Sequence, residues 1–390
     1  MEDSRDAWNP CRIALLAFLV RCVAAAVSSG TNDIRTWELF GSFAAQHGVS
    51  ALYQNFTLSQ TNFALFNHPP LMGVLAGAIY KISSLLKIPF SIAFKFPEIV
   101  ADTCSVLVVG TFIEKRGGSV TVQNAGTRIY ACALPAILIS GFHGNTDPLC
   151  ALFLLLSALN LQRNCHLRAG LLLGLALNVK VLALIALPAL FATAPTWRAR
   201  TRFSVGLVAL VIPLMYALAV TPHGLENVFG YKSFVALWGV RIVALIINPE
   251  TWNSPSMGIF RFIMGASLLL DAALRVWRKN SDPAQALFSA WAIFLILSPG
   301  FGLQYLIYPI APLIVIDPAI GVWFSFAVGL YLLDVYFHFL LPGLPLTTFH
   351  NNPITFPDAV ALAALVWLML GSALVRTWPT KSPYPSSART

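Results

Sequence analysis

Apolar runs recur along the whole chain and alternate with short polar segments that carry most of its charges. A helix needs ~20 residues to cross the hydrocarbon core of a bilayer, and several of these runs approach or exceed that length. The pattern therefore predicts a protein built from membrane-spanning helices. We expect single spans over residues 13–29, 90–113, 128–142, 148–162, 203–220, 257–276, 319–340 and 359–375.

Two other apolar stretches are interpreted as pairs of short helices. Arginines lie shortly before and after the stretch 169–192. Because Lys and Arg are enriched in cytosolic loops, both of its ends are expected on the cytosolic side. We predict a hairpin whose tip, residues 178–180, places Lys180 in a cavity open to the outside; a single span with a snorkelling lysine is the alternative. A second short pair is expected at 287–297 and 303–316.

The first outer loop, residues 31–90, has a pattern of its own. Apolar side chains between Ile34 and Phe43 recur at helical spacing, which predicts an amphipathic helix lying in the membrane interface. The stretch 69–86 is apolar but contains glycines, serines and a lysine, so we interpret it as a second interfacial or re-entrant helix. If it crossed the membrane, the basic loops that follow would face outward, against the positive-inside tendency. A second outer loop is expected over 221–256.

Together these patterns predict an all-α fold, a polytopic transmembrane helical bundle of about 12 crossings, some of them short, with interfacial helices in the first outer loop. Residues 1–379 are expected to form one integral-membrane domain. The Ser- and Pro-rich tail 380–390 is expected to be disordered and cytosolic. The distribution of Lys and Arg places the N-terminus in the cytosol as well.

Composition supports a membrane protein and argues against a nucleic-acid-binding one. The chain is 57% hydrophobic and 11% charged, whereas soluble domains carry roughly a quarter charged residues. Its net charge of +9 comes from short basic clusters between apolar runs, as in the cytosolic loops of membrane proteins. We therefore expect no nucleic-acid partner. The six cysteines have no spacing that predicts a metal site or disulfides.

The predicted topology gathers polar side chains on the outer face of the bundle. Motifs of soluble enzymes, such as a glycine-rich phosphate loop, HExxH or a serine-centred elbow, are absent from the sequence. Asp33 directly follows the first apolar run, which places a carboxylate at the boundary between water and lipid. The groups expected to converge there are Asp33, Arg35, Glu38, His68, His143, Asp147, Lys180, Lys232, Arg241 and Gln304.

Four motifs in a fixed order carry a resemblance to a known family. Asp33 precedes TWELF, HGNTD ends at Asp147, AGLLLGLALNVKVLALIALPAL contains Lys180, and SPGFGLQYLIYPIAPL contains Gln304. The chain thereby resembles the GT-C superfamily of membrane glycosyltransferases, in particular its polyprenol-dependent, mannosyltransferase-like branches. This resemblance implies transfer of a hexose, with mannose the default, from a polyprenyl-phosphate donor to a glycan, lipid or protein acceptor on the extracytosolic face. The membrane would be the bacterial cytoplasmic membrane or the endoplasmic reticulum.

The resemblance also implies roles for individual residues. Asp33 would be the general base of an inverting transfer, because the acceptor hydroxyl must lose a proton near the anomeric carbon. Superfamily members often have an acidic pair in this loop and some use a divalent metal; Asp33 stands alone in TND, so metal is not favoured and no cofactor is expected. Substrate binding is expected from Glu38, His68, His143, Asp147 and Gln304, and lipid-phosphate binding from Arg21, Lys180, Lys232 and Arg241.

Each role has a structural alternative. Asp33 is also a residue type that commonly caps a helix, and Asp147 precedes a proline as a helix-start residue does. Arg21, within the first span, could instead form an internal ion pair, and the same is expected of Asp102. Glu38 would then only be part of a solvated helix face.

The alternative function is a multi-pass transporter or lipid-linked sugar flippase without covalent chemistry. Intramembrane charges and broken helices fit a carrier as well as an enzyme. The long first outer loop with an acidic residue at its start favours the enzyme, because a carrier would place its key charges near the midplane of the membrane.

Overall fold

The computed structural model describes residues 10–54, 65–230, 238–240, 257–279, 282–298, 300–340 and 357–378. Within these residues all regular secondary structure is helical, which confirms the predicted all-α class for this part of the chain. The tail 380–390, expected to be disordered, lies outside the described residues.

Four helices in the described part are long and apolar enough to cross a membrane: α5 (Phe90–Lys115), α11 (Trp197–Val220), α17 (Pro318–Leu340) and α19 (Pro357–Thr377). A fifth span results if two segments bent by 45°, Val120–Ala131 and Leu134–His143, are counted as one. The expected total of about 12 crossings is not supported, because six other apolar helices have only 10–17 residues. Helices of that length rise roughly 15–26 Å, less than the ~30 Å hydrocarbon core.

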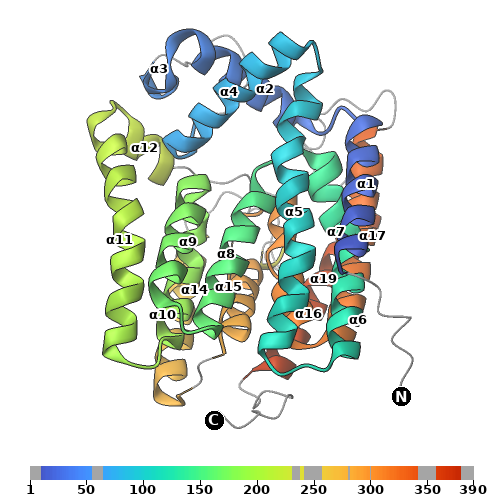
Figure 1. Ribbon diagram of the computed structural model, residues 1–390, viewed down its shortest axis with the longest axis vertical. Helices are drawn as coiled ribbons and strands as arrows, with labels where there is room; N and C mark the ends of the chain where they lie inside the picture. The colour runs from blue at the N-terminus through green and yellow to red at the C-terminus, as the bar shows by residue number, and fades with distance from the viewer. Residues whose placement is uncertain are drawn as a thin grey trace.

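Three hairpins of short or bent helices form the centre of the bundle (Figure 1). The first hairpin consists of α6 (Val120–Ala131), α7 (Leu134–Ile137), the π-helix η1 (Leu138–His143) and α8 (Asp147–Gln162). The second consists of α9 (His166–Val179), the 3₁₀-helix η2 (Val181–Ala186) and α10 (Leu187–Thr193). The third consists of α15 (Pro283–Leu297), the 3₁₀-helix η4 (Leu303–Ile307) and α16 (Ile310–Ile316).

The second hairpin has the break that the flanking arginines predicted. Lys180 lies between α9 and η2 in an extended conformation, with φ −153° and ψ 120°, so the helix is interrupted there. Both ends of this hairpin point away from α2, towards the turns that follow α8 and precede α11. The single-span alternative is therefore wrong. The third hairpin has its break at the expected place, between Leu297 and Leu303.

The open end of the third hairpin is held by Arg116 at the end of α5. Its guanidinium donates to the carbonyl oxygen of Val315 at 2.6 Å and to Oδ2 of Asp282 at 2.5 Å. Asp282 caps α15 and Val315 belongs to α16, so one arginine ties both ends of the third hairpin to α5. The closed ends of the three hairpins meet at the opposite side, where Lys180 contacts Asp147 and the Tyr305 ring.

Close approach between helices depends on small residues. A Cβ added to Gly170 on α9 would lie 1.9 Å from the carbonyl oxygen of Phe203 on α11. A Cβ added to Gly206 on α11 would lie 2.2 Å from the carbonyl oxygen of Leu167. Two facing glycines therefore bring these backbones into direct contact, as small residues do in membrane helix pairs.

The segment expected to form the first outer loop contains α2 (Asn32–His47), α3 (Val49–Gln54) and α4 (Pro70–Leu86), which lie across one end of the bundle (Figure 1). The predicted apolar stripe of α2 is buried at Ile34, Trp37 and Phe40 and packs against α4. A Cβ on Gly41 would lie 2.7 Å from the carbonyl oxygen of Ala76 on α4. The two helices thus form a tight cap, and α4 does not run along the bundle.

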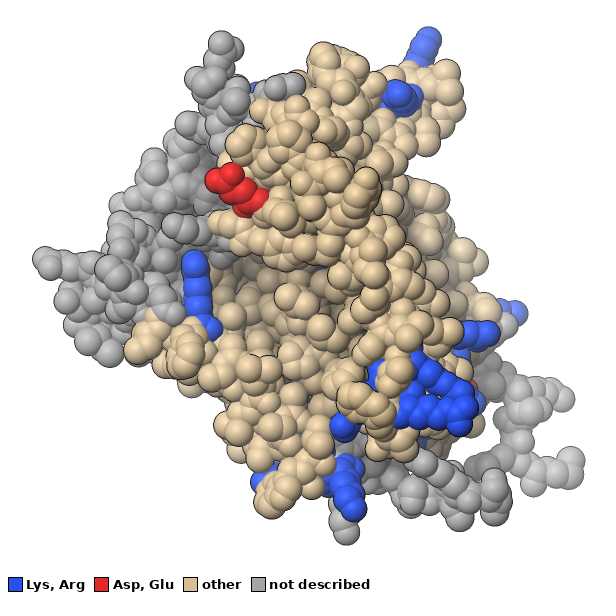
Figure 2. All heavy atoms as spheres, turned by 90° about the vertical axis from the view of Figure 1, so that its left-hand side faces the viewer, with Lys and Arg blue, Asp and Glu red and all other residues tan. Residues whose placement is uncertain are grey.

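The remaining described helices enclose this core: α1 (Pro10–Ala26), α12 (Gly224–Phe229) and α14 (Met257–Trp277). α12 lies at the start of the segment expected to form the second outer loop, and Asn227 Nδ2 donates to the carbonyl oxygen of Tyr53 at 3.4 Å, which links α12 to α3. Figure 2 shows a face with few charged side chains between the two ends of the molecule, with Lys and Arg most frequent towards the end opposite α2 and some also at the α2 end. This distribution agrees with the clustering of Lys and Arg in the loops that the sequence analysis expected on the cytosolic side.

Candidate functional site

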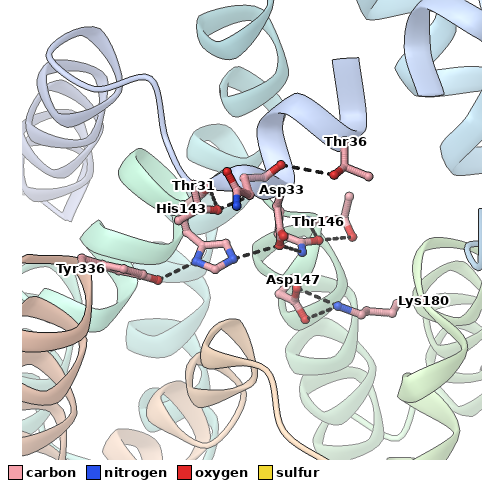
Figure 3. A network of polar contacts seen from close by, with 10 residues as sticks. Thr31, Asp33, Thr36, His143, Thr146, Asp147, Lys180 and Tyr336 are labelled. Atoms are coloured by element: carbon pink, nitrogen blue, oxygen red, sulfur yellow. Dashed lines mark hydrogen bonds and ion pairs between the residues drawn. The ribbon is translucent and has the colours of Figure 1, made fainter. Parts of the chain in front are cut away.

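A polar cluster lies where the closed ends of the three hairpins meet the start of α2 (Figure 3). We use this name for Asp33, His143, Asn145, Asp147, Lys180 and Tyr336, which are joined by hydrogen bonds or charge interactions. They come from α2, η1 and the turn after it, α8, the break after α9, and α17. Four of the six, namely Asp33, His143, Asp147 and Lys180, are residues that the sequence analysis selected.

Asp33 is not the cap of its helix. The N-cap of α2 is Thr31, whose hydroxyl accepts the backbone N–H of Asp33 at 3.4 Å. The Asp33 side chain is 40% exposed and turns towards His143 instead. The capping alternative is therefore wrong, and the carboxylate is available for another role.

One oxygen of the Asp33 carboxylate is held from two sides. Oδ2 lies 3.1 Å from His143 Nε2 and accepts the side-chain amide of Asn145 at 2.6 Å. Oδ1 makes no hydrogen bond within the described part of the chain. The carboxylate is thus oriented through one oxygen, and its side chain as a whole stays 40% exposed.

The surroundings of Asp33 also favour its ionised form. Burial by itself raises the pKa of the Asp33 carboxyl, but the hydrogen bond and electrostatic interaction with His143 oppose this, followed by the Asn145 hydrogen bond and the charge of Lys180. The net result is a pKa below the ordinary value of an aspartate. Asp33 is consequently a carboxylate at neutral pH.

The segment before Asp33 is anchored to the first hairpin. The backbone N–H and the hydroxyl of Thr31 both donate to the carbonyl oxygen of His143, at 3.2 and 3.0 Å. A Cβ at Gly30, whose φ is +90°, would lie 3.0 Å from the carbonyl oxygen of Phe142, so only glycine allows this approach. Buried Lys95 of α5 donates to the carbonyl oxygen and hydroxyl of Ser28 at 2.9 and 3.1 Å.

The turn that presents Asn145 follows the π-helix η1. Gly144 ends this element with φ +79°, a conformation that disfavours any residue with a Cβ, and a Cβ there would also displace the Ile34 side chain, 2.2 Å away. Asn145 Oδ1 accepts the backbone N–H of Thr146 at 2.7 Å, which aims the amide nitrogen at Asp33. π-Helical turns are frequent at functional sites because they shift side chains out of the α-helical register.

The ion pair of Asp147 and Lys180 connects the first two hairpins. Lys180 Nζ lies 2.9 and 2.8 Å from the two carboxylate oxygens of Asp147, whose side chain is fully buried. Tyr308 of the third hairpin donates its hydroxyl to Asp147 at 2.8 Å, and the Tyr305 ring centre lies 4.8 Å from Lys180 Nζ. All three hairpins therefore meet at this pair.

The predicted role of Asp147 changes with these contacts. Its side chain has no exposure and both oxygens are occupied by protein donors, so direct substrate binding does not fit. We interpret Asp147 as the counter-ion that holds Lys180 at the break of its helix. Lys180 keeps 10% side-chain exposure and has three N–H donors, so capacity for another anion remains.

Arg21 does not fit its predicted role in binding a lipid phosphate. Its side chain is fully buried, and its Nε lies 2.5 Å from Asp102 Oδ2. Tyr130 and Ser140 donate to the same carboxylate, and the backbone oxygens of Ala17 and Ala131 accept from Arg21. The internal ion pair, which was the alternative, is the observed state.

The other predicted site residues fall into three groups. Glu38 is exposed on the far side of α2 and makes no described contact with the polar cluster, as a residue of a solvated face would. Gln304 is half-buried next to Tyr305 on η4, without a described hydrogen bond. Lys232 and Arg241 lie outside the described residues.

His68 lies beside the cluster in an aromatic layer. Its ring centre is 4.5 Å from that of Trp37 and 5.9 Å from that of Phe66. Burial and the charge of Lys180 lower the pKa of His68 to about 3, although the charge of Asp33 opposes this shift. His68 is therefore a neutral imidazole that can both donate and accept a hydrogen bond.

Sequence reasoning missed several members of the site. Asn145 lies in the selected HGNTD motif between His143 and Asp147, and this position could have indicated that it belongs to the site. Tyr336 and Tyr308 are aromatic residues of apolar segments, and no sequence pattern separates them from membrane anchors. Buried Glu98 of α5, which accepts the backbone N–H of Leu149 at 3.0 Å, was a charge in a predicted span and could have been noted with Asp102.

The described residues contain no group of three or more His, Cys, Asp or Glu side chains that could hold a metal ion. No family model matches the chain, and no curated protein matches it.

Proposed function

We propose that this chain is a membrane glycosyltransferase that transfers a hexose, by default mannose, from a polyprenyl-phosphate donor to an acceptor hydroxyl. The observation that carries the proposal is the state of Asp33, a carboxylate whose Oδ2 is held by two partners, while Oδ1 makes no hydrogen bond in the described residues and the side chain stays 40% exposed. A general base requires an ionised group, a fixed direction and access to the reacting proton, and Asp33 meets all three.

The proposed reaction is a direct displacement. Asp33 Oδ1 takes the proton of the acceptor hydroxyl while that oxygen attacks the anomeric carbon of the donor. The bond between this carbon and the phosphate oxygen breaks, and its electron pair leaves with the lipid phosphate. A single displacement inverts the anomeric centre. The resulting charge on the phosphate is met by the ammonium group of Lys180, whose charge already acts on Asp33.

The location of the cluster suits a lipid-linked donor. Asp33 lies at the junction of the apolar bundle and the cap formed by α2 and α4, where a lipid chain and a water-borne acceptor can meet. His68, as a neutral donor and acceptor beside Trp37, is placed to bind hexose hydroxyls. We propose an outward-facing, extracytosolic orientation of this end, with both termini in the cytosol, in a bacterial cytoplasmic membrane or the endoplasmic reticulum.

The proposal is tested with purified protein and a panel of polyprenyl-phosphate hexoses. Mass spectrometry should detect a hexosylated acceptor and free polyprenyl phosphate in equal amounts, without added divalent metal. Candidate acceptors are short glycans, glycolipids and peptides. Absence of both products from every donor and acceptor pair, with protein whose thermal unfolding is normal, would reject the glycosyltransferase.

Substitution of Asn145 by alanine should change the pH dependence of transfer. The variant loses a hydrogen bond that lowers the pKa of Asp33, so this pKa should rise. Because Asp33 must be ionised, activity disappears as the pH falls through its pKa, and the acid limb of the profile should move to higher pH. Rates across the acid range measure this; Asn160→Ala, which removes an amide bonded to a backbone oxygen of α8, is the control. An unchanged acid limb in Asn145→Ala would contradict the assignment.

A carrier for lipid-linked sugars is the second candidate. The observation in its favour is the buried Asp147–Lys180 pair at the break of a helix, an arrangement that transporters use for substrate and ion sites. Proteoliposomes with labelled polyprenyl-phosphate hexose on one side separate the two functions. A carrier moves the intact molecule across the bilayer, whereas the proposed enzyme cleaves it.

A further inference from the structure

His143 uses both of its ring nitrogens inside the protein. Nε2 faces Asp33 Oδ2 at 3.1 Å, and Nδ1 lies 2.6 Å from the hydroxyl oxygen of Tyr336. The His143 and Tyr336 residues are 5% and 2% exposed, so water does not replace either contact. Figure 3 shows Tyr336, His143 and Asp33 in a row.

The direction of these hydrogen bonds follows from the chemistry of the groups. An ionised carboxylate only accepts hydrogen bonds, so Nε2 must carry the proton that faces Asp33. In neutral imidazole Nδ1 then has a lone pair and needs a donor. The Tyr336 hydroxyl is that donor, because it can rotate its proton towards Nδ1. The tautomer of a histidine is set in this way by the partner of its other nitrogen.

We propose that Tyr336 is a positioning residue that fixes the tautomer of His143 and, through it, the direction of the Asp33 carboxylate. The catalytic part of this proposal rests on the proposed function, whereas the effect on the tautomer does not. Tyr336 acts from α17, more than 300 residues after Asp33 in the chain. It touches neither Asp33 nor, in our mechanism, the substrate.

The opposite tautomer would disturb the site. With the proton on Nδ1, the lone pair of Nε2 would face Asp33 Oδ2, and two acceptors would repel each other. Asp33 would then keep only the Asn145 donor and could turn its open oxygen away from the acceptor. The Tyr336 hydroxyl prevents this state, because it offers Nδ1 a proton.

The test compares two phenylalanine substitutions on the same helix. Tyr336→Phe removes the hydroxyl that faces His143. Tyr331→Phe is the control, since Tyr331 is equally buried, packs 5.9 Å from the Trp238 ring and makes no hydroxyl hydrogen bond in the described part of the chain. The tautomer is read from ¹⁵N NMR of histidine-labelled protein, with the His143 signals identified by their loss in His143→Ala.

The expected spectrum of the unaltered protein and of Tyr331→Phe shows proton occupancy at Nε2 of His143. Tyr336→Phe should show a mixture of both tautomers. Its kcat should fall roughly tenfold to a hundredfold, the usual effect of losing a partner that orients a functional histidine, while KM stays nearly constant. In the His143→Ala background the same substitution should cause no further loss, because the residue through which Tyr336 acts is gone.

Two results would overturn the proposal. One is an unchanged His143 tautomer in Tyr336→Phe; the other is an equal loss of activity from Tyr336→Phe with and without His143. If no donor is turned over by the unaltered protein, the proposed function fails, but the NMR comparison still decides whether Tyr336 sets the tautomer. Thermal unfolding of each variant separates these effects from a folding defect.

Discussion

Asp33→Asn should reduce hexose transfer by about 10²–10⁴-fold, the usual contribution of a general base. Asparagine keeps the size of the side chain and an oxygen that accepts hydrogen bonds, but it cannot take a proton. The fold should be unaffected, because Thr31 caps α2 and the Asp33 side chain is 40% exposed. The measurement is the initial rate of product formation at saturating donor, together with the thermal unfolding temperature.

Glu38→Gln is the matched control for this substitution. It removes the same charge from the same helix, at an exposed position outside the polar cluster. Transfer by Glu38→Gln should therefore equal that of the unaltered protein. A rate close to normal in Asp33→Asn would remove Asp33 as the base, whatever the behaviour of the control.

Asp147→Asn should destabilise the protein by about 3–5 kcal/mol, because it leaves a buried ammonium group without its counter-ion. The exposure of the two side chains is 10% for Lys180 and none for Asp147, so water cannot substitute for the carboxylate. The hairpins that meet at this pair should separate more easily. The free energy of unfolding in detergent measures the effect, and Glu114→Gln, from an ion pair that is 44% and 49% exposed, should change little.

The double variant Asp147→Asn, Lys180→Met separates stability from function. Removing both charges of a buried pair is often neutral, so the double variant should regain most of the stability lost in Asp147→Asn. Transfer should stay low, since no ammonium group remains to meet the departing phosphate. A double variant that regains stability and also full activity would show that Lys180 has only a structural role.

In residues 31–90, the local sequence pattern was sufficient to predict a helix and its buried face. A helix that buries one face repeats its apolar residues every 3.6 positions, so Ile34, Trp37 and Phe40 predicted α2 and its buried stripe correctly. The break at Lys180 was predicted from charge, because arginines on both sides of an apolar stretch require its ends to share one side. Each of these features depends only on residues that are near in sequence.

The partners of buried charges were not predictable in the same way. Arg21 and Asp102 were both noted in apolar segments, yet the sequence left Arg21 between a lipid phosphate and an ion pair. The choice depends on the packing of α1 against α5, which places two residues 81 positions apart within 2.5 Å. Asp147 was likewise selected as a polar group of the site, but its burial, which argues against direct substrate binding, was not visible in the sequence.

By itself, the sequence determined that the protein is helical and apolar, where two of its apolar stretches break, and which end of the bundle collects its polar side chains. These properties follow from periodicity and charge, which each segment carries alone. The tertiary structure decided how many helices are long enough to cross a membrane and which polar side chains touch. It joined Tyr336 and Asn145 to Asp33 and gave Lys180 its counter-ion. Such contacts arise from the packing of distant helices, and a buried polar group is stable only with the particular partner that this packing provides.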